Sequence, residues 1–328
     1  MRKNRLFLIL SLLAIAAMVL GACTTPEEPV VVDEPVVEEP EVVEEPEVVE
    51  EPEMAALGTE ENPIIWAFVP SGEMERVAAG AQSVADLLNE KTGLYFDTMV
   101  ATEYAGVIEA LRSDPPAAHM ASLATFAYVM AADMGVVEAE LVSSRYGNAF
   151  YNGQIIARAD SGVTKLADLK GKTFARPDPL STSGWIIPMI TLKAAGVDPE
   201  RDIKVVDAGS HDAVVAAVYN GEVDGGACYV DARTRIEKDH PDVMEKIAVI
   251  EVSVNIPNDG VQFHPSVPQE LRDQIVNALL EIVETEEGKE ALNTAYQWTA
   301  LEKHKDDFYD PFRQVLQAAG IKAQDLME

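Results

Sequence analysis

The chain has 328 residues, of which 56 are acidic and 25 are basic, and its formal net charge at pH 7 is −31. This excess of negative charge opposes binding to nucleic acids and to anionic lipid surfaces. The five histidines are scattered and the two cysteines, Cys23 and Cys228, lie far apart, so the sequence predicts no metal site and no other cofactor.

The first 22 residues have the pattern of a secretory signal peptide. A basic segment at 1–5 precedes an apolar stretch at 6–20, which is shorter than the about 20 residues of a membrane-spanning helix. The Leu-Gly-Ala-Cys ending resembles the bacterial lipobox and implies a diacylated Cys23, although an ordinary signal peptide with a chance cysteine is the alternative. We therefore expect a protein that is exported across the cytoplasmic membrane and lipid-anchored at its outer face. Cys228 then has no disulfide partner and is expected in the core.

Residues 23–61 are predicted to form a tether. Between residues 26 and 53 the chain repeats Glu-Glu-Pro-Glu-Val-Val with small variations, and this stretch carries 13 acidic residues and no basic one. Proline opposes helix and central strand, and the like charges repel one another. We expect an extended, disordered spacer.

From residue 62 onward, short apolar segments alternate with segments of helical hydrophobic spacing. In chain order we expect a strand at 64–69, a helix at 75–91, strands at 95–100 and 119–121 with a helix at 104–112 between them, and a helix at 123–134. A strand at 154–157, a short helix at 166–171, a strand at 172–175, a helix at 185–195, a strand at 204–207 and a helix at 213–220 follow. The remaining elements are a strand at 223–228, a helix at 232–238, strands at 247–252 and 261–264, and helices at 268–286, 288–300 and 311–319. This alternation predicts an α/β protein whose parallel sheets are covered by helices and whose ligands bind beyond the carboxyl ends of the strands.

The segment Ser181-Thr-Ser-Gly184 is the strongest candidate for a binding site. It lies between a predicted strand and a predicted helix, so its backbone N–H groups fall in the first turn, where they have no partner within the helix. Three hydroxyl side chains and the easy backbone bend at Gly184 complete a site for an oxyanion without a lysine. The alternative is an ordinary helix N-cap, because serine and threonine begin many helices.

Seven segments in register resemble one known family. They lie at 101–111, 158–162, 166–172, 181–184, 209–213, 220–224 and 256–259. Together they are similar to the phosphate/phosphite/phosphonate-binding lipoproteins of ABC importers, the PhnD-like branch of the type II periplasmic binding proteins. The resemblance covers roughly residues 62–300. It implies two α/β lobes, each with a mixed, mainly parallel sheet, joined by a two-stranded hinge. Lobe 1 would comprise 62–152 and 258–328, the latter including the C-terminal helices, and lobe 2 would comprise 153–257.

The same resemblance implies the ligand-binding residues. Tyr104 and Tyr151 match tyrosines that donate to a phosphonate oxygen, although Phe150 leaves the register of the second one open, and His211 matches a histidine that contacts the same group. The full set implied is Tyr104, Tyr151, Ser181, Thr182, Ser183, His211, Asp231 and Asp259, and Gly184 of the same turn is a further candidate. Residues 119–126 depart from the family pattern at the expected pocket floor, where Ser122 or Thr125 could still supply a hydroxyl or a helix-start N–H as further ligand-binding candidates.

The two acids bear on the ligand's charge. Asp259 matches an aspartate at the hinge return, and Asp231 stands where relatives use an acidic residue for a ligand amino group; the alternative for Asp231 is a helix N-cap. A carboxylate repels an oxyanion unless a proton lies between them. If both acids line the cleft, an aminoalkylphosphonate or a protonated oxyanion is favoured.

The implied function is binding rather than catalysis. The receptor would close around a phosphonate, phosphite or phosphate and present it to a membrane permease powered by an ATPase. An enzyme on the same scaffold is disfavoured because no metal cluster, Gly-x-Ser-x-Gly motif or nucleophile–base pair is evident. A sensory binding protein, or a receptor for a sulfonate or a thiamine precursor, remains open.

Overall fold

The computed structural model describes residues 55–322. The predicted signal peptide, the lipidated Cys23 and most of the predicted tether lie outside these residues. Residues 55–61, which we assigned to the tether, form a turn instead: Gly58 N–H donates to Asn62 O at 2.8 Å, and Gly58 O accepts from Tyr95 N–H at 2.9 Å. None of the helices between 55 and 322 combines the length and apolar composition that crossing a bilayer requires.

One sheet has six strands in the order β13-β4-β12-β3-β1-β2. These strands are β1 (Ile64–Phe68), β2 (Phe96–Val100), β3 (Met120–Ser122), β4 (Glu138–Ser144), β12 (Gly260–Phe263) and β13 (Ala300–Lys303). Strand β1 pairs in parallel with β2 and β3, whereas the pairs β12–β3, β12–β4 and β13–β4 are antiparallel. The chain therefore returns to this sheet after a long excursion.

That excursion builds a second sheet of five strands, in the order β10-β6-β9-β7-β8. These strands are β6 (Gly153–Arg158), β7 (Thr173–Arg176), β8 (Lys204–Asp207), β9 (Gly225–Tyr229) and β10 (Ile247–Val252). Strand β7 is parallel to β8 and β9, and β6 is antiparallel to β9 and β10. Where the chain leaves and re-enters the first sheet, β5 (Phe150–Tyr151) pairs with β11 (Ile256–Pro257) in a separate two-stranded sheet.

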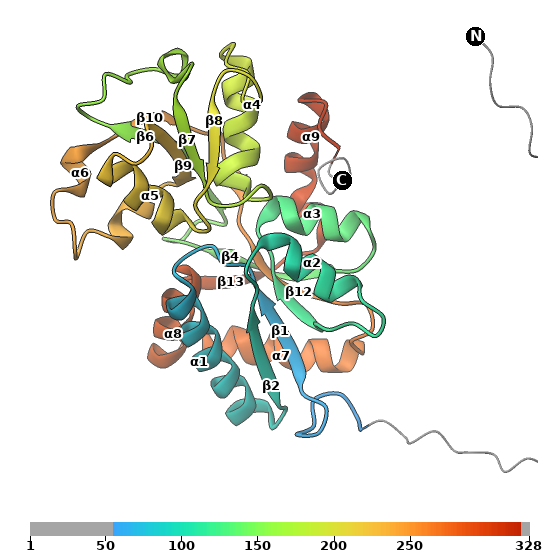
Figure 1. Ribbon diagram of the computed structural model, residues 1–328. Coiled ribbons are helices and arrows are strands. Elements are labelled where there is room, and N and C mark those ends of the chain that lie inside the picture. The colour runs from blue at the N-terminus through green and yellow to red at the C-terminus, as the bar shows by residue number, and fades with distance from the viewer. Residues whose placement is uncertain (1–54, 323–328) are drawn as a thin grey trace, which may run out of the picture. The chain divides into compact units, whose positions relative to one another are not determined.

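The helices fall into two groups, those outside and those within the excursion that builds the five-stranded sheet. Those before and after the excursion are α1 (Met74–Thr92), α2 (Tyr104–Arg112), α3 (Thr125–Asp133), α7 (Gln269–Ile282), α8 (Glu286–Tyr296) and α9 (Asp310–Ala318), the last preceded by the 3-10 turn η4 (Asp306–Tyr309). Within the excursion lie η1 (Leu166–Leu169), η2 (Thr182–Ile186), α4 (Ile187–Ala194), α5 (His211–Asn220), η3 (Ala232–Arg235) and α6 (Val243–Lys246). Helices α1 and α8 lie side by side, and α2 lies beside α3 (Figure 1).

The mixed α/β fold is confirmed, but the expectation of mainly parallel sheets is wrong. Among the described strands, three of five pairings in the six-stranded sheet and two of four in the five-stranded sheet are antiparallel. The physical reason is the double crossing of the chain, because returning strands such as β12 enter the sheet from the opposite end.

Several element predictions were also wrong. Strand β4 was missed because its sequence, Glu-Ala-Glu-Leu-Val-Ser-Ser, looks polar, yet six of its seven residues are buried. Its Glu140 carboxylate is compensated by Lys305, at 2.5 Å. The helix predicted at 288–300 ends at Tyr296, since Gln297 adopts a left-handed φ of 59°, and β13 follows. The helix predicted at 232–238 is only the short turn η3.

Candidate functional site

A cavity of about 300 Å³ lies between elements of the six-stranded and five-stranded sheets. Its wall includes all eight residues that the sequence analysis placed in the main ligand-binding set: Tyr104, Tyr151, Ser181, Thr182, Ser183, His211, Asp231 and Asp259. The eight residues span 155 sequence positions, from Tyr104 to Asp259. The volume lies at the lower end of the range for small-molecule sites.

The Ser181–Gly184 segment begins a helix, as predicted, but its first turn is π-helical rather than α-helical. The N-cap alternative is confirmed, and it does not remove the segment from the cavity wall. Ser181 is the N-cap, because its Oγ accepts from Gly184 N–H at 3.2 Å, and the hydroxyl-bearing residues of the turn still face the cavity. The first-turn N–H groups of such a helix have no intrahelical partner. The turn therefore presents amides and hydroxyls on one surface.

Two glycines let this turn pack tightly. A Cβ on Gly184 would lie 2.3 Å from Pro177 Cδ, and a Cβ on Gly153 would lie 2.8 Å from Ser183 O. The Gly184 candidate thus does not line the cavity but allows the turn to lie against the preceding loop. Glycine at 153 serves the same purpose on strand β6, against which the turn rests.

His211 begins helix α5 and is buried. Its Nδ1 accepts from Tyr229 N–H at 3.3 Å, which places the proton of the neutral ring on Nε2, 3.3 Å from Ser181 Oγ. Burial, with a smaller contribution from Arg145, lowers the pKa of His211 to about 3. The side chain is therefore a neutral donor aimed at the Ser181 hydroxyl and the cavity.

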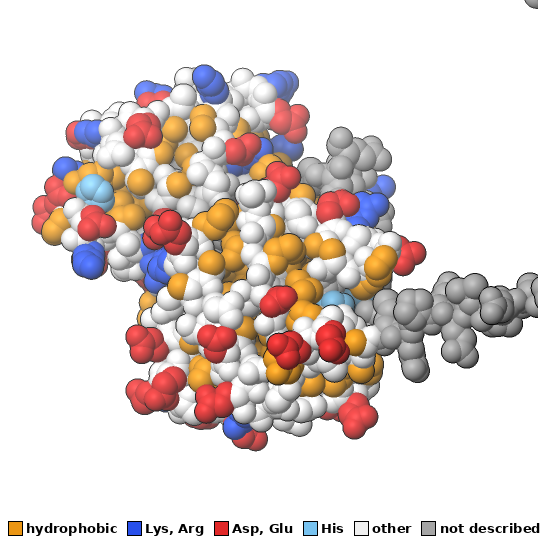
Figure 2. Space-filling view, turned by 60° about the horizontal axis from the view of Figure 1, so that its bottom comes forward, with side chains coloured by type: hydrophobic (Ala, Val, Ile, Leu, Met, Phe, Trp, Pro, Cys, Tyr) orange, Lys and Arg blue, Asp and Glu red, His pale blue; other side chains and the backbone are white. Residues whose placement is uncertain are grey.

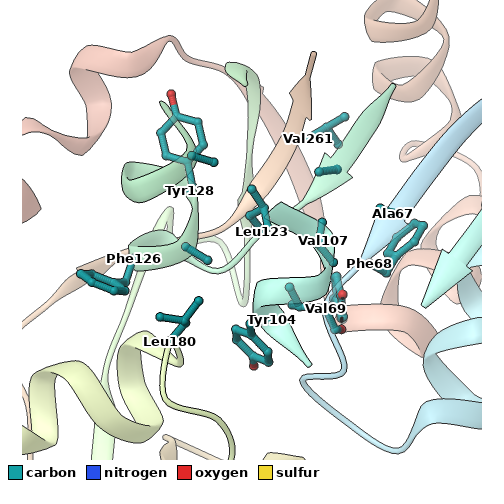
Figure 3. Close-up of a cluster of buried hydrophobic side chains, with 14 of the residues drawn as sticks. Ala67, Phe68, Val69, Tyr104, Val107, Leu123, Phe126, Tyr128, Leu180 and Val261 are labelled. Atoms are coloured by element: carbon teal, nitrogen blue, oxygen red, sulfur yellow. Dashed lines mark hydrogen bonds between the residues drawn. The ribbon is translucent and has the colours of Figure 1, made fainter. Parts of the chain in front are cut away.

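The two tyrosines stand on the side of the six-stranded sheet and its neighbouring β5. Figure 3 shows the ring of Tyr104 at the edge of a buried apolar cluster, with its hydroxyl directed away from that cluster. Burial raises the pKa of Tyr104 well above its ordinary value, and it also raises the pKa of Tyr151, where the Ser183 hydroxyl partly offsets the effect. Both hydroxyls therefore keep their protons. Phe150 also lines the cavity, but its ring packs on Phe308 with centroids 5.2 Å apart.

Asp259 is paired with Arg145, a residue that the sequence analysis missed. Arg145 Nη1 lies 2.6 Å from Asp259 Oδ1 and Nη2 lies 3.0 Å from Oδ2, so the contact is bidentate. The same guanidinium donates to Asn258 Oδ1 at 2.7 Å and to Tyr296 O at 3.1 Å. Burial alone would lower the pKa of Arg145, but Asp259 outweighs burial and the net change is upward. The charge of Asp259 is thus compensated within the protein.

Asp231 behaves differently, because it is exposed at the cavity wall and adopts a left-handed φ of 71°. Asp231 does occupy the N-cap position of η3, as the alternative held, but its side chain makes no capping hydrogen bond within the part of the chain described. Arg76 and Arg235 also line the cavity and were missed. Arg76 is paired with Asp212 at 2.6 Å. No local motif marks Arg76, since its partner Asp212 lies 136 positions later in the sequence.

Two further candidates lie off the cavity. In the lining formed by residues 55–322, neither Ser122 nor Thr125 takes part. Ser122 Oγ accepts from Trp66 Nε1 at 3.1 Å, and Thr125 Oγ1 donates to Pro257 O at 2.6 Å. Both hydroxyls are therefore used inside the fold, and this loop contributes Ala124 to the wall instead.

One face of the molecule is rich in acidic side chains. Figure 2 shows acidic side chains spread over the face in view, with few basic ones on its lower half. Of the three arginines of the wall, Arg76 pairs with Asp212 and Arg145 with Asp259, whereas no ion pair of Arg235 is found among residues 55–322. The wall therefore offers an anion hydroxyls, amides and the neutral imidazole, together with the guanidinium of Arg235.

Comparison with known proteins identifies relatives named for phosphonate binding or phosphate import. A family model described as "ABC transporter, phosphonate, periplasmic substrate-binding protein" matches residues 66–309. The phosphonates-binding periplasmic protein of Escherichia coli K12 is 26% identical over 233 residues, which are 70% of this chain and 68% of that protein. The phosphate-import protein PhnD of Mycolicibacterium smegmatis is 31% identical over 189 residues, which are 53% of this chain and 58% of that protein.

Solved structures show the same fold. A binding-protein component of a phosphonate ABC transporter from Pseudomonas aeruginosa superposes with a TM-score of 0.72 at 24% identity, covering 79% of this chain and 87% of that one. PhnD1 of Prochlorococcus marinus, solved with methylphosphonate, gives a TM-score of 0.69 at 14% identity, with 78% and 98% covered. The type II periplasmic binding protein fold expected from the sequence is therefore confirmed.

Proposed function

We propose a ligand class and a binding mode for this chain from the premise that it belongs to the family of periplasmic substrate-binding proteins of phosphonate ABC transporters. This family consists of extracytoplasmic transport proteins and is not an enzyme family. The proposed ligand is a tetrahedral phosphorus oxyanion, namely a phosphonate, phosphite or phosphate, which the chain delivers to a permease and its ATPase. The observation that carries this proposal is the convergence of the eight predicted residues on one cavity.

The proposed lobes follow the change of sheet along the chain. Residues 62–152 and 258–328 would form lobe 1 around the six-stranded sheet, and 153–257 would form lobe 2 around the five-stranded sheet. The β5–β11 pair stands at both crossings and would act as the hinge. A few residues at such crossings can absorb the backbone rotation of domain closure.

The proposed contacts use neutral donors. The phosphoryl oxygens would accept from the hydroxyls at 181–183 and the backbone amides at 182 and 183, from the Nε2–H of His211 and from the hydroxyls of Tyr104 and Tyr151. Hydrogen bonds to an ionised oxygen are about twice as strong as neutral ones. A ligand lacking an expected oxygen would leave buried donors unpaired, which costs about 1–3 kcal/mol for each group. Tetrahedral geometry would thus be the basis of selection.

The remaining part of the ligand would face Asp231. Because Arg145 compensates Asp259, only Asp231 of the two predicted acids stays free to receive an ammonium group. The cavity of about 300 Å³ corresponds to roughly ten water molecules at their volume in the liquid. A phosphonate with a small organic substituent fits this space and these charges better than a bare oxyanion does.

Export and anchoring complete the proposal. A signal peptide at 1–22, a lipidated Cys23 and the acidic tether would hold the receptor at the outer face of the membrane. Anchoring of this kind raises the local concentration of a receptor near its permease. Mass spectrometry of the purified membrane-bound protein would test it, because a diacylglyceryl group on Cys23 gives a defined mass increase.

Calorimetry tests the ligand class directly. We expect the soluble form, without its first 22 residues and with Cys23→Ser, to bind one molecule per chain of methylphosphonate, 2-aminoethylphosphonate, phosphite or phosphate. Taurine, which carries a sulfonate, serves as the comparison. A chain that binds taurine and none of the four phosphorus compounds would be a sulfonate receptor, and this proposal would be wrong.

A further inference from the structure

The loop that follows strand β7 reaches from the five-stranded sheet into the elements of the six-stranded sheet. Asp178 lies in this loop and is only 6% exposed. Its Oδ2 accepts from Tyr104 N–H at 3.0 Å, and its Oδ1 accepts from Leu180 N–H at 2.7 Å. One carboxylate thus bonds simultaneously to the start of helix α2 and to the loop before the oxyanion turn.

Helix α2 depends on this contact for its cap. The residue before it, Glu103, is extended, and its side chain makes no capping hydrogen bond within the described part of the chain. The N–H groups of a first helical turn need such a partner. Asp178 supplies it from 74 residues further along the chain, and its negative charge also suits the positive end of the helix dipole.

Two more residues of the same loop make contacts on the same side. Leu180 is 4% exposed and lies between Phe126 and Tyr104 in the apolar cluster (Figure 3). Thr182 Oγ1 accepts from Phe126 N–H at 2.8 Å, near the start of helix α3. Alternate residues of the segment 178–182 thus contact α2, the core and α3 in turn. We call this segment the anchor loop.

The anchor loop joins the two halves of the proposed site. Ser181 belongs to it and lines the cavity from the five-stranded side, whereas Tyr104 lines the cavity from the other side. The Asp178–Tyr104 contact therefore sets how the hydroxyl of Ser181 stands relative to that of Tyr104. Burial raises the pKa of Asp178, and its bonds to the two N–H groups partly offset this by favouring the carboxylate.

We propose that Asp178 is a positioning residue that couples closure of the two lobes to assembly of the oxyanion site. It touches no ligand itself. Its hydrogen bond to Leu180 N–H lies within the anchor loop, whereas its hydrogen bond to Tyr104 N–H forms only when the lobes meet and brings the donors of the two lobes to one point. This inference rests on the proposed function, because it assigns a role within the same site.

The chain provides a matched control. Asp168 is also a carboxylate that accepts two backbone N–H groups, from Thr164 at 3.0 Å and Lys165 at 3.2 Å, but all three residues belong to one loop of the five-stranded half. Asp178→Asn and Asp168→Asn make the same chemical change, and only the first interrupts a contact between the halves. A general effect of losing a capping carboxylate would appear in both.

The experiment measures ligand affinity and dissociation rate with methylphosphonate and phosphate as probes. Hydrogen bonds to a charged group contribute about 1.5–3 kcal/mol, so we expect Asp178→Asn to weaken binding at least about tenfold. The loss should lie mainly in a faster dissociation rate, since the open lobes still meet the ligand freely. Small-angle scattering should show a smaller ligand-induced compaction for Asp178→Asn than for the wild type or Asp168→Asn.

The outcomes separate the two proposals. A wild-type protein that binds neither probe refutes the proposed function. If the wild type binds a probe, two results would refute the role of Asp178. One is an affinity of Asp178→Asn within twofold of the wild-type affinity, and the other is an equal loss of affinity in Asp168→Asn. If Asp178→Asn does not fold, Leu180→Ala removes the apolar contact of the same loop, and unchanged dissociation in that variant would equally overturn the inference.

Discussion

His211 should make the stability of the protein fall as the pH is lowered. Its folded-state pKa, about 3, lies below the ordinary value of 6.5, because burial and then Arg145 disfavour the charged ring. Below pH 6.5 the unfolded chain takes up a proton that the folded chain refuses. Stability is therefore present above pH 6.5 and is lost as the pH falls toward 3.

The size of the effect follows from the two pKa values. One pKa unit corresponds to 1.36 kcal/mol, so the loss between pH 7 and pH 5 amounts to about 2 kcal/mol and the whole effect to roughly 5 kcal/mol. Carboxylates also titrate in acid, so the wild type alone cannot isolate this contribution. Comparing the wild type with His211→Gln isolates the contribution of His211, because glutamine keeps an N–H donor but does not take up a proton.

The assay is urea unfolding followed by tryptophan fluorescence at pH 7 and pH 5. We expect the free energy of unfolding of the wild type to fall by about 2 kcal/mol more than that of His211→Gln over this range. His240→Gln is the control, since His240 is only partly buried and lies outside the cavity. Equal pH dependence in the wild type and His211→Gln would show that His211 is not held neutral by burial, and the donor role assigned to it would fail.

Three further predictions concern the cavity. Arg145→Gln leaves its partner carboxylate unpaired, so calorimetry should show at least about tenfold weaker binding of methylphosphonate and a smaller loss for 2-aminoethylphosphonate; equal losses would contradict the charge argument. Gly184→Ala drives a methyl group into Pro177 and should weaken the binding of both methylphosphonate and 2-aminoethylphosphonate. Gly106→Ala, whose Cβ would lie 3.3 Å from its nearest neighbour, should leave the binding of both ligands unchanged. Asp231→Asn should weaken the binding of 2-aminoethylphosphonate more than that of phosphorus ligands without an ammonium group. An equal change of affinity for all of them would exclude an ammonium contact at Asp231.

The residues of the site were predictable where a local pattern marks them. Ser181 to Gly184 stand between a strand and a helix, and the amides and hydroxyls of that arrangement follow from helix geometry alone. His211 and the two tyrosines needed the family resemblance, because a lone histidine or tyrosine has no intrinsic signature. Ser122 and Thr125 were candidates at a loop where the sequence departs from the family, and their hydroxyls bond to Trp66 and Pro257 instead.

The remaining features could not be predicted because their causes are long-range. Arg145 is indistinguishable from a surface arginine until the fold brings Asp259 to within 2.6 Å of it. Strand β4 looks polar because its Glu140 is buried only with the help of Lys305, which lies 165 positions later. The antiparallel pairings likewise depend on the return of the chain through β12, which no local pattern reveals.

The use of arginine in this molecule explains how an acidic protein can hold an anion. Two of the arginines in the cavity wall are paired with carboxylates, Arg76 with Asp212 and Arg145 with Asp259, so neither adds a net charge to the site. A free guanidinium would attract many anions regardless of shape, whereas hydroxyls, amides and a neutral imidazole act only over hydrogen-bonding distances and directions. Neutral donors are satisfied only by oxygens in the right places. In the proposed binding mode, selectivity for the shape of a phosphorus group would follow from these neutral donors, and the pairing of Arg76 and Arg145 with aspartates keeps two of the three guanidinium groups in the wall from acting as free charges.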